Sequence, residues 1–217
     1  MRLENKVAIV TGGGSGFGAG IAAKFVAEGA KVLIADRDPA GGEKVAEALG
    51  ANARSLKVDV SKSADVKAMI DAAHDLFGGL DILVNNAGMG HVPQPLEALV
   101  EDDFDRIVAV NIKSIYLAAR EVVPRFKAQK SGVILNVAST AGVSPRPRLA
   151  WYNASKGWVI TATRSMAVEL APFGIRVVAL NPVAGETPML KTFMGEDTPE
   201  MRAKFLATIP IGRFSTP

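Results

Sequence analysis

The stretch that decides the fold runs from residue 6 to residue 29 and reads KVAIVTGGGSGFGAGIAAKFVAEG. It opens with a short apolar run, residues 6 to 10, which is typical of a strand buried on both faces of a sheet. A turn rich in glycine follows, and apolar residues then recur at helical spacing until Gly29, a helix stop signal. The segment therefore predicts a strand, a glycine turn and a helix.

The glycine turn has the spacing Gly14-x-Gly16-x-x-Ala19, one form of the dinucleotide-binding fingerprint. Glycines let the backbone turn tightly and approach a pyrophosphate, which binds at the N-terminus of the following helix. A P-loop is excluded because no Gly-Lys-Ser/Thr follows. A nucleophile elbow on Ser15 is excluded because Phe17 stands where its second glycine is needed.

A second apolar run, residues 31 to 36, predicts a strand that ends in a carboxylate. Asp36 lies 20 positions beyond Gly16, where an acid binds the ribose hydroxyls of NAD and repels the 2′-phosphate of NADP. Arg37 is the opposing signal, because a guanidinium at this position can bind that phosphate. Together these residues favour NAD over NADP.

The alternation of strand and helix patterns continues as far as residue 180. We expect further strands at residues 54–58, 81–84, 133–138 and 175–180, and helices at 39–50, about 61–78, 101–124 and about 152–171. This order predicts an α/β fold, a doubly wound Rossmann-type parallel sheet flanked by helices. No boundary or linker interrupts it, so we expect one domain over residues 1–217. Ligands of such sheets bind outside the carboxyl ends of the strands.

Composition narrows the classes of function. The chain has 217 residues, a net charge of +3, no cysteine and two histidines. We therefore expect no disulfide, no thiolate chemistry and no metal site. Its lysines and arginines are scattered and it has no recognised nucleic-acid module, so we expect no nucleic-acid partner. It shows no leader pattern and no apolar run of membrane length, so we expect a cytoplasmic protein that acts on a small molecule.

One later stretch, residues 139 to 156, carries a hydroxyl, a phenol and an amine. If a helix begins near Tyr152, the four-residue step places Lys156 on the same helix face. A nearby cation lowers the pKa of a phenol, which can then exchange a proton with an alkoxide. Ser139 can hydrogen-bond the same oxygen. Spacing alone also fits a solvated surface pair, because Tyr116 and Arg120 have the same step.

Taken in order, these motifs resemble the short-chain dehydrogenase/reductase family over essentially the whole chain, including its 3-oxoacyl-[acyl-carrier-protein] reductase-like and glucose dehydrogenase-like members. The matches to the family are the cofactor loop Thr-Gly-x-x-x-Gly-x-Gly from Thr11, the Asn-Asn-Ala-Gly motif at residues 85–88, Asn111 on the long helix, Ser139 thirteen positions before Tyr152, and Tyr-x-x-x-Lys ending at Lys156.

The resemblance implies hydride transfer between NAD(H) and a carbonyl or secondary alcohol. Its implied catalytic residues are Asn111, Ser139, Tyr152 and Lys156. Tyr152 is then the general acid/base, and Lys156 lowers its pKa and holds the nicotinamide ribose. Ser139 orients the substrate oxygen, and Asn111 anchors a water in a proton relay.

The resemblance also implies a set of cofactor contacts. These are Gly12, Ser15, Gly16, Phe17, Gly18, Asp36, Arg37, Asp59, Val60, Asn86, Ala87, Gly88, Tyr152, Lys156, Pro182 and Thr187. In this set Asp59 and Val60 meet the adenine edge, Asn86 and Ala87 form the floor, and Thr187 reaches the nicotinamide carboxamide. A homo-oligomer, a dimer or a homotetramer, is the implied assembly.

Three features depart from the family pattern. The usual Pro-Gly after the sixth strand is Pro182-Val183, with the glycine delayed to Gly185, and Phe17 replaces a small aliphatic residue. The chain stops at Pro217, after a Ser-Thr-Pro signature of a helix start, whereas family members continue through a helix and a strand. We expect a truncation or a break there, and we expect the fold to lack the family's last helix and strand.

The substrate is left open by the sequence. Residues 144–151 and a lid at about 183–210 are expected to line its pocket, and a 3-oxoacyl thioester, a sugar and a cyclic ketone all fit. Arg146 and Arg148 could meet an anionic substrate or face water, and we expect water. Two other interpretations stay open: a non-catalytic dinucleotide-binding protein, and an S-adenosylmethionine-dependent methyltransferase, although the latter leaves Ser139, Tyr152 and Lys156 unexplained.

Overall fold

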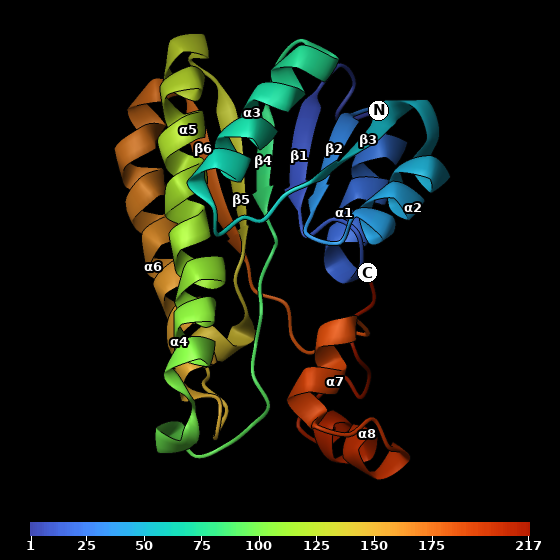
Figure 1. Ribbon diagram of the computed structural model, residues 1–217, viewed down its shortest axis with the longest axis vertical. Helices are drawn as coiled ribbons and strands as arrows, with labels where there is room; N and C mark the ends of the chain where they lie inside the picture. The colour runs from blue at the N-terminus through green and yellow to red at the C-terminus, as the bar shows by residue number, and fades with distance from the viewer.

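Six parallel strands form the centre of the computed structural model, which describes all residues from 1 to 217. Their order in the sheet is β3-β2-β1-β4-β5-β6 (Figure 1). The strands are β1 (Val7–Thr11), β2 (Lys31–Asp36), β3 (Ala53–Lys57), β4 (Ile82–Asn85), β5 (Gly132–Val137) and β6 (Ile175–Leu180). Each predicted strand is found within one residue of its expected bounds, and the doubly wound α/β fold is confirmed.

Helices connect the strands and cover the sheet. They are α1 (Gly16–Ala27), α2 (Pro39–Leu49), α3 (Ser63–Phe77), α4 (Glu101–Ile107), α5 (Ser114–Gln129), α6 (Ala150–Leu170), α7 (Pro188–Met194) and α8 (Pro199–Leu206). One prediction needs correction, because the single helix expected at 101–124 is α4 and α5 joined by a π-helical stretch, Val108–Lys113. Such stretches insert one residue into a helix and are frequent at functional sites.

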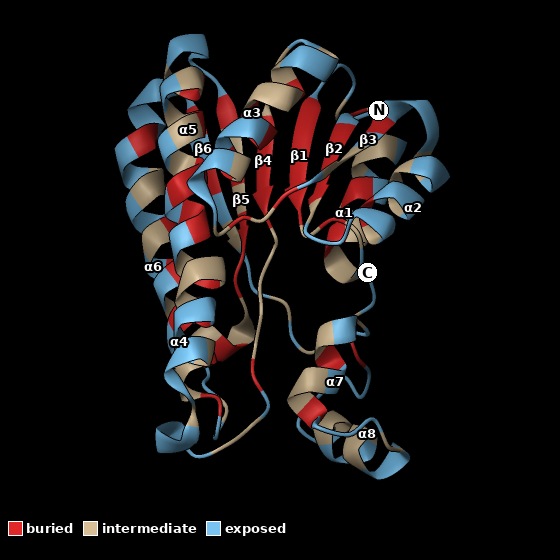
Figure 2. Ribbon diagram, in the orientation of Figure 1, coloured by how far each residue is buried: buried red, intermediate tan, exposed pale blue.

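Alternating side chains of the strands build two apolar layers. On one face, Ile9 and Leu33 pack with apolar residues of α3 and α5. On the other, Val10 and Ile34 pack with α1 and α2. All four of these strand residues are fully buried, and Figure 2 shows the inner strands as the most buried part of the molecule. Strands this apolar on both faces explain the continuous hydrophobic runs in the sequence.

The strand order reverses between β1 and β4. β1 pairs with β2 on one side and with β4 on the other, although β4 follows it by some 70 positions in the chain. The loops leaving these two strands therefore run to opposite sides of the sheet and open a crevice between them, which is where open α/β sheets bind ligands.

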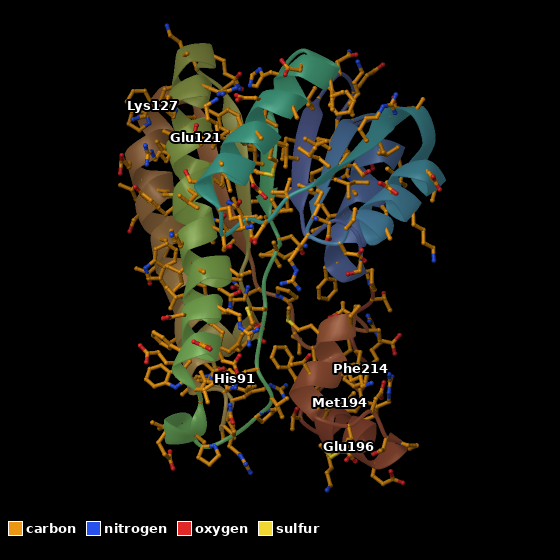
Figure 3. The ribbon with its side chains drawn as sticks, viewed as in Figure 1. His91, Glu121, Lys127, Met194, Glu196 and Phe214 are labelled. Atoms are coloured by element: carbon orange, nitrogen blue, oxygen red, sulfur yellow. The ribbon has the colours of Figure 1, made fainter.

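The segment containing α7 and α8 has a small core of its own. Leu190, Met194, Ile209 and Phe214 are buried together in one apolar cluster, and Figure 3 labels two of them, Met194 and Phe214, in this segment. In Figure 1 the segment lies beyond the end of the sheet, apart from the helices that cover its faces. None of the helices in the chain is both long and apolar enough to cross a membrane.

Candidate active site

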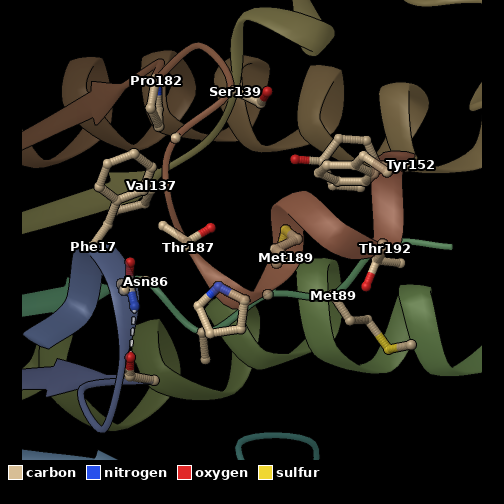
Figure 4. Close-up of a pocket in the computed structure, with 18 of the residues that line it drawn as sticks. Phe17, Asn86, Met89, Val137, Ser139, Tyr152, Pro182, Thr187, Met189 and Thr192 are labelled. Atoms are coloured by element: carbon tan, nitrogen blue, oxygen red, sulfur yellow. Dashed lines mark hydrogen bonds between the residues drawn. The ribbon is translucent and has the colours of Figure 1, made fainter. Parts of the chain in front are cut away.

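A cavity of about 570 Å³ lies at the carboxyl ends of the strands, between the sheet and α7 (Figure 4). Cavities of this size are typical of small-molecule sites. All but two of the residues predicted as catalytic or cofactor-binding line it. Those that line it are Gly12, Ser15, Gly16, Phe17, Asp36, Arg37, Asp59, Val60, Asn86, Ala87, Gly88, Ser139, Tyr152, Lys156, Pro182 and Thr187.

Gly18 is one of the two that do not line the cavity. A Cβ added to it would lie 2.1 Å from the carbonyl oxygen of Gly12 and 2.5 Å from Asn86 Nδ2. The residue is buried in α1 beneath the glycine turn. Its small size lets the helix pack closely against the turn, so it supports the cavity from below and does not face it.

Asn111 is the other, and it lies in the π-helical stretch behind the cavity. Its Oδ1 accepts a hydrogen bond from the Met89 backbone N–H at 2.9 Å, and its Nδ2 donates to Met89 O and Ser155 Oγ, each at 2.9 Å. Both amide protons are used, and the side chain is 2% exposed. Asn111 therefore ties the loop after β4 to α6.

The loops after β1 and β4 are fixed to each other across the crevice. Thr11 Oγ1 accepts hydrogen bonds from the backbone N–H groups of Asn86 and Ala87, both at 3.0 Å. Asn86 Nδ2 donates in return to the carbonyls of Thr11 at 2.8 Å and Gly12 at 3.0 Å. These four bonds hold the glycine turn and the Asn-Asn-Ala-Gly motif as one rigid floor.

The groups along this floor fit a dinucleotide. α1 begins at Gly16, and the preceding Ser15 makes no side-chain cap, so the first N–H groups of the helix have no partner in the helix and can bind an anion. Asp36 stands at the end of β2, held by Gly14 N–H at 2.8 Å and Asp38 N–H at 2.9 Å. Its carboxylate is thereby positioned to accept hydrogen bonds from ribose hydroxyls.

Asp59 stands one strand further along the same edge. The Ser61 hydroxyl, which donates to its Oδ1 at 2.6 Å, holds the pKa of the Asp59 carboxyl below its usual range. This carboxylate therefore stays ionised at the end of the cavity lined by Val60, where the sequence predicts the adenine edge of the cofactor.

Tyr152 and Ser139 point their hydroxyl groups into the same part of the cavity, from α6 and from the end of β5 (Figure 4). Tyr152 is 5% exposed. Burial raises the pKa of its phenol, and the Ser139 side chain opposes part of that increase. The net shift of the pKa is therefore upward and not downward as expected, because removing the phenol from water outweighs the other influences.

Lys156 lies one turn further along α6 and is also 5% exposed. Its Nζ donates to the carbonyl of Val137 at 2.9 Å and lies 5.9 Å from the centroid of the Tyr152 ring. Burial lowers the pKa of Lys156 to about 8. The group is therefore still mostly an ammonium at neutral pH.

A buried polar chain that the sequence did not reveal fixes these elements. Asn85 Nδ2 donates to Asn136 Oδ1 at 2.8 Å, and Asn136 Nδ2 donates to Thr163 Oγ1 at 2.9 Å. The chain links β4, β5 and α6, which carry the cavity floor, Ser139 and Tyr152. Its only sequence signal is an asparagine within an apolar strand, where a polar side chain needs a partner.

Helix α7 lies against the end of the cavity that contains Tyr152. The Phe193 ring lies 4.8 Å from the Tyr152 ring, centroid to centroid, and packs so closely on Gly90 that a Cβ there would lie 2.4 Å from it. Met189 lines the cavity as well, whereas Met194 belongs to the core of the α7–α8 segment. The apolar residues of this stretch therefore divide between the wall of the cavity and the core of the α7–α8 segment.

The two departures at Phe17 and Gly185 meet in space. A Cβ added to Gly185 would lie 2.2 Å from Cζ of the Phe17 ring, so the ring rests directly on this glycine. The delayed glycine therefore makes room for the larger side chain of the glycine turn. The loop after β6 passes the cavity in this position, with Pro182 accepting a hydrogen bond from Thr140 N–H at 3.1 Å.

We predict that Gly185→Ala destabilises the protein by about 1–3 kcal/mol, because the added methyl group overpacks the contact with Phe17. Phe17→Leu in the same chain is expected to recover most of that loss. Urea unfolding of the two single variants and the double variant measures the coupling. Gly79→Ala is the control, because a Cβ there meets no atom within 4 Å. Additive effects of the two substitutions would contradict the contact.

Known proteins resemble the chain over its whole length. The sequence model described as short chain dehydrogenase matches residues 6–197. The 4-formylbenzenesulfonate dehydrogenase of Comamonas testosteroni is 50% identical, over 100% of this chain and 88% of that protein. The galactitol 2-dehydrogenase of Agrobacterium fabrum is 39% identical, with the same coverage of each.

A solved structure agrees with these relatives. The 3-ketoacyl-(acyl-carrier-protein) reductase from Brucella melitensis, complexed with NADH, superposes with a TM-score of 0.93 at 54% identity, covering 98% of this chain and 86% of that one. The fold, the floor of the cavity and the sequence relatives all lead to one assignment. The chain belongs to the short-chain dehydrogenase family, and the relatives named above are dehydrogenases and a reductase.

Proposed function

We propose that this protein is an NAD-preferring oxidoreductase that interconverts a carbonyl compound and its alcohol, with Tyr152 as general acid/base. The observation that carries the proposal is the meeting of Ser139, Tyr152 and Lys156 in the cavity that also contains the glycine turn. The test is NADH-dependent reduction of a panel of carbonyl compounds by the purified protein. The panel includes thioesters, sugars, cyclic ketones and aromatic aldehydes.

When bound, the nicotinamide gives or takes the hydride at the reacting carbon. In the direction of reduction, Tyr152 donates its phenolic proton to the carbonyl oxygen as that oxygen gains negative charge. Ser139 donates a hydrogen bond to the same oxygen and orients it. The Lys156 ammonium stabilises the phenolate that is left, because opposite charges attract strongly in a cavity with little water.

Asn111 takes part in this proposal by binding Met89 and Ser155 and by helping to hold a water of the proton relay. Its amide protons hold Met89 and Ser155, so a water of the proton relay can reach only the second lone pair of Oδ1 or a backbone atom of the π-helical stretch. That Oδ1 and Lys156 Nζ both approach Gly88, within 3.4 and 3.3 Å of a Cβ built there. The relay then runs from this point through Lys156 toward Tyr152.

The preference for NAD over NADP rests on Asp36. We predict that Asp36→Ala lowers the ratio of NADH affinity to NADPH affinity by about tenfold or more, because the carboxylate no longer binds the ribose or repels a 2′-phosphate. Parallel titrations with both cofactors measure the ratio. Asp38→Ala is the matched control, since Asp38 caps α2 through Ala40 N–H. An unchanged ratio in Asp36→Ala would remove this residue from its role.

The proposal extends to the setting of the enzyme. We place it in the cytoplasm as a homo-oligomer, a dimer or tetramer, with a small-molecule substrate and with residues 183–210 serving as the substrate lid of a single domain. Sedimentation of the purified protein tests the assembly. The relatives named above are dehydrogenases and reductases, so neither the methyltransferase nor the non-catalytic interpretation is favoured.

A further inference from the structure

Arg146 occupies an unusual position at the catalytic end of the cavity. It lies on the loop between β5 and α6, is partly buried, and lines the cavity together with Tyr152. Its guanidinium carbon lies 4.5 Å from the centroid of the Phe205 ring on α8, and its Nη2 donates to Thr208 Oγ1 at 3.3 Å. Contrary to the expectation that it simply faces water, this side chain is only partly exposed and lines the cavity, whereas Arg148 is exposed as expected.

No carboxylate accompanies this guanidinium. Arg146 takes part in none of the ion pairs of the protein. Burial alone lowers its pKa, with no acidic group opposing the decrease. A cation that is withdrawn from water without a partner costs free energy, and an anion that enters the cavity recovers that cost.

The acidic residues lining the cavity all lie toward one end of the sheet. The two carboxylates, Asp36 and Asp59, follow β2 and β3 together with the cation Arg37, whereas Arg146 and Lys156 follow β5. Strands β2 and β3 stand at the opposite end of the sheet order from β5 and β6. The adenosine end is therefore the only part of the cavity lined by acids, and the catalytic end is cationic.

The position of Arg146 is fixed relative to the catalytic tyrosine. Asn153 Nδ2 donates to the carbonyl of Arg146 at 2.7 Å, and Asn153 is the neighbour of Tyr152 in α6. Apolar side chains adjoin both residues: Phe193 packs on the Tyr152 ring, Phe205 lies under the Arg146 guanidinium, and Leu149 lines the same cavity. This lining suits a substrate with an apolar body that contacts both the phenol and the guanidinium.

We propose that Arg146 binds an anionic group, a sulfonate or a carboxylate, of an apolar or aromatic carbonyl substrate whose reacting oxygen lies at Tyr152. The planar fork of N–H donors in a guanidinium matches the paired oxygens of both anions. This inference rests on the proposed function and adds the class of substrate to it.

The contacts with Phe205 and Thr208 also allow a purely mechanical role, in which Arg146 only fastens α8 over the cavity. A mechanical role affects charged and neutral ligands alike, whereas recognition of an anion affects only the charged ones. The test therefore compares ligands that share a body and differ in charge.

Calorimetry on the NADH-loaded protein uses three ligands: 4-methylbenzenesulfonate, 4-methylbenzoate and the neutral 4-methylbenzenesulfonamide. For Arg146→Gln we expect the Kd of at least one anion to rise about 10- to 100-fold. The Kd of the sulfonamide is expected to change by less than about threefold. Arg146→Lys, which keeps the positive charge, is expected to lose less affinity for the anions than Arg146→Gln does. Arg148→Gln, on the same loop but exposed, is expected to bind all three ligands as the wild type does.

Three results overturn the inference. The wild type binds neither anion, Arg146→Gln loses as much affinity for the sulfonamide as for the anions, or Arg148→Gln loses as much affinity for the anions as Arg146→Gln does. NADH affinity, measured first in each variant, shows that the variant is folded. If the wild type itself does not bind NADH, the proposed function fails and the inference fails with it. If NADH binds and the anions do not, only the inference fails.

Discussion

Tyr152→Phe should lower kcat by about 10²- to 10⁴-fold and leave the affinity for NADH within about twofold of the wild type. The range is the usual contribution of a positioned acid/base group. The variant loses only the hydroxyl, so the ring still packs on Phe193 at the position it occupies in the wild type, 4.8 Å between centroids. Steady-state rates with any carbonyl that the wild type reduces, together with an NADH titration, measure both quantities.

The matched control is Tyr116→Phe. Tyr116 is 56% exposed on α5 and has no part in the cavity, so this variant should keep its full rate. A rate in Tyr152→Phe that falls less than about tenfold would mean that another group carries the proton.

Lys156→Met is the second large change, and it should affect turnover and stability in different ways. Removing the ammonium should lower kcat by about 10²-fold or more, because the phenolate of Tyr152 loses the cation that lies one turn further along α6. Burial lowers the pKa of Lys156 to about 8, against 10.5 for a free lysine. Below about pH 8 the buried Lys156 is charged and destabilises the folded wild type. As the pH rises above this value the group loses its proton, and this destabilisation disappears.

The sign of the effect follows from proton binding. Between about pH 8 and 10.5 the unfolded chain keeps the Lys156 proton and the folded chain loses it, so the free energy of unfolding rises with pH. Relative to Lys156→Met, the wild type should gain up to ~3 kcal/mol over this interval. Urea unfolding across the interval measures the difference. Lys31→Met, at the exposed start of β2, should follow the wild type. Parallel curves for wild type and Lys156→Met would contradict the burial of the charge.

The sequence predicts most of the sheet because its strands are buried on both faces. Runs such as residues 31–36 have few other stable environments, and the loops after them carry the residues that face the ligand. The meeting of Asp36, Asn86 and Tyr152 in one cavity follows from parallel topology alone. Asp36 ends β2, Asn86 follows β4 and Tyr152 lies in the helix after β5, and the carboxyl ends of parallel strands bring these segments to one edge.

Other features depend on packing that no local pattern encodes. The π-helical stretch at Val108–Lys113 has the same apolar spacing as an ordinary helix, so only its contacts reveal it. The pKa of Tyr152 depends on how much water reaches the phenol, which the spacing to Lys156 does not determine. The contact between Phe17 and Gly185 joins two residues far apart in sequence, each of which had been interpreted separately.

The central claim is that the cavity is a nicotinamide dinucleotide site selective for NAD, and one measurement tests it without a known substrate. The 217-residue protein is titrated in parallel with NADH and NADPH, and the fluorescence of each cofactor is followed. We predict saturable binding of NADH and binding of NADPH that is at least about tenfold weaker, as the Asp36 carboxylate requires. Binding of neither cofactor, or tighter binding of NADPH, would contradict the account.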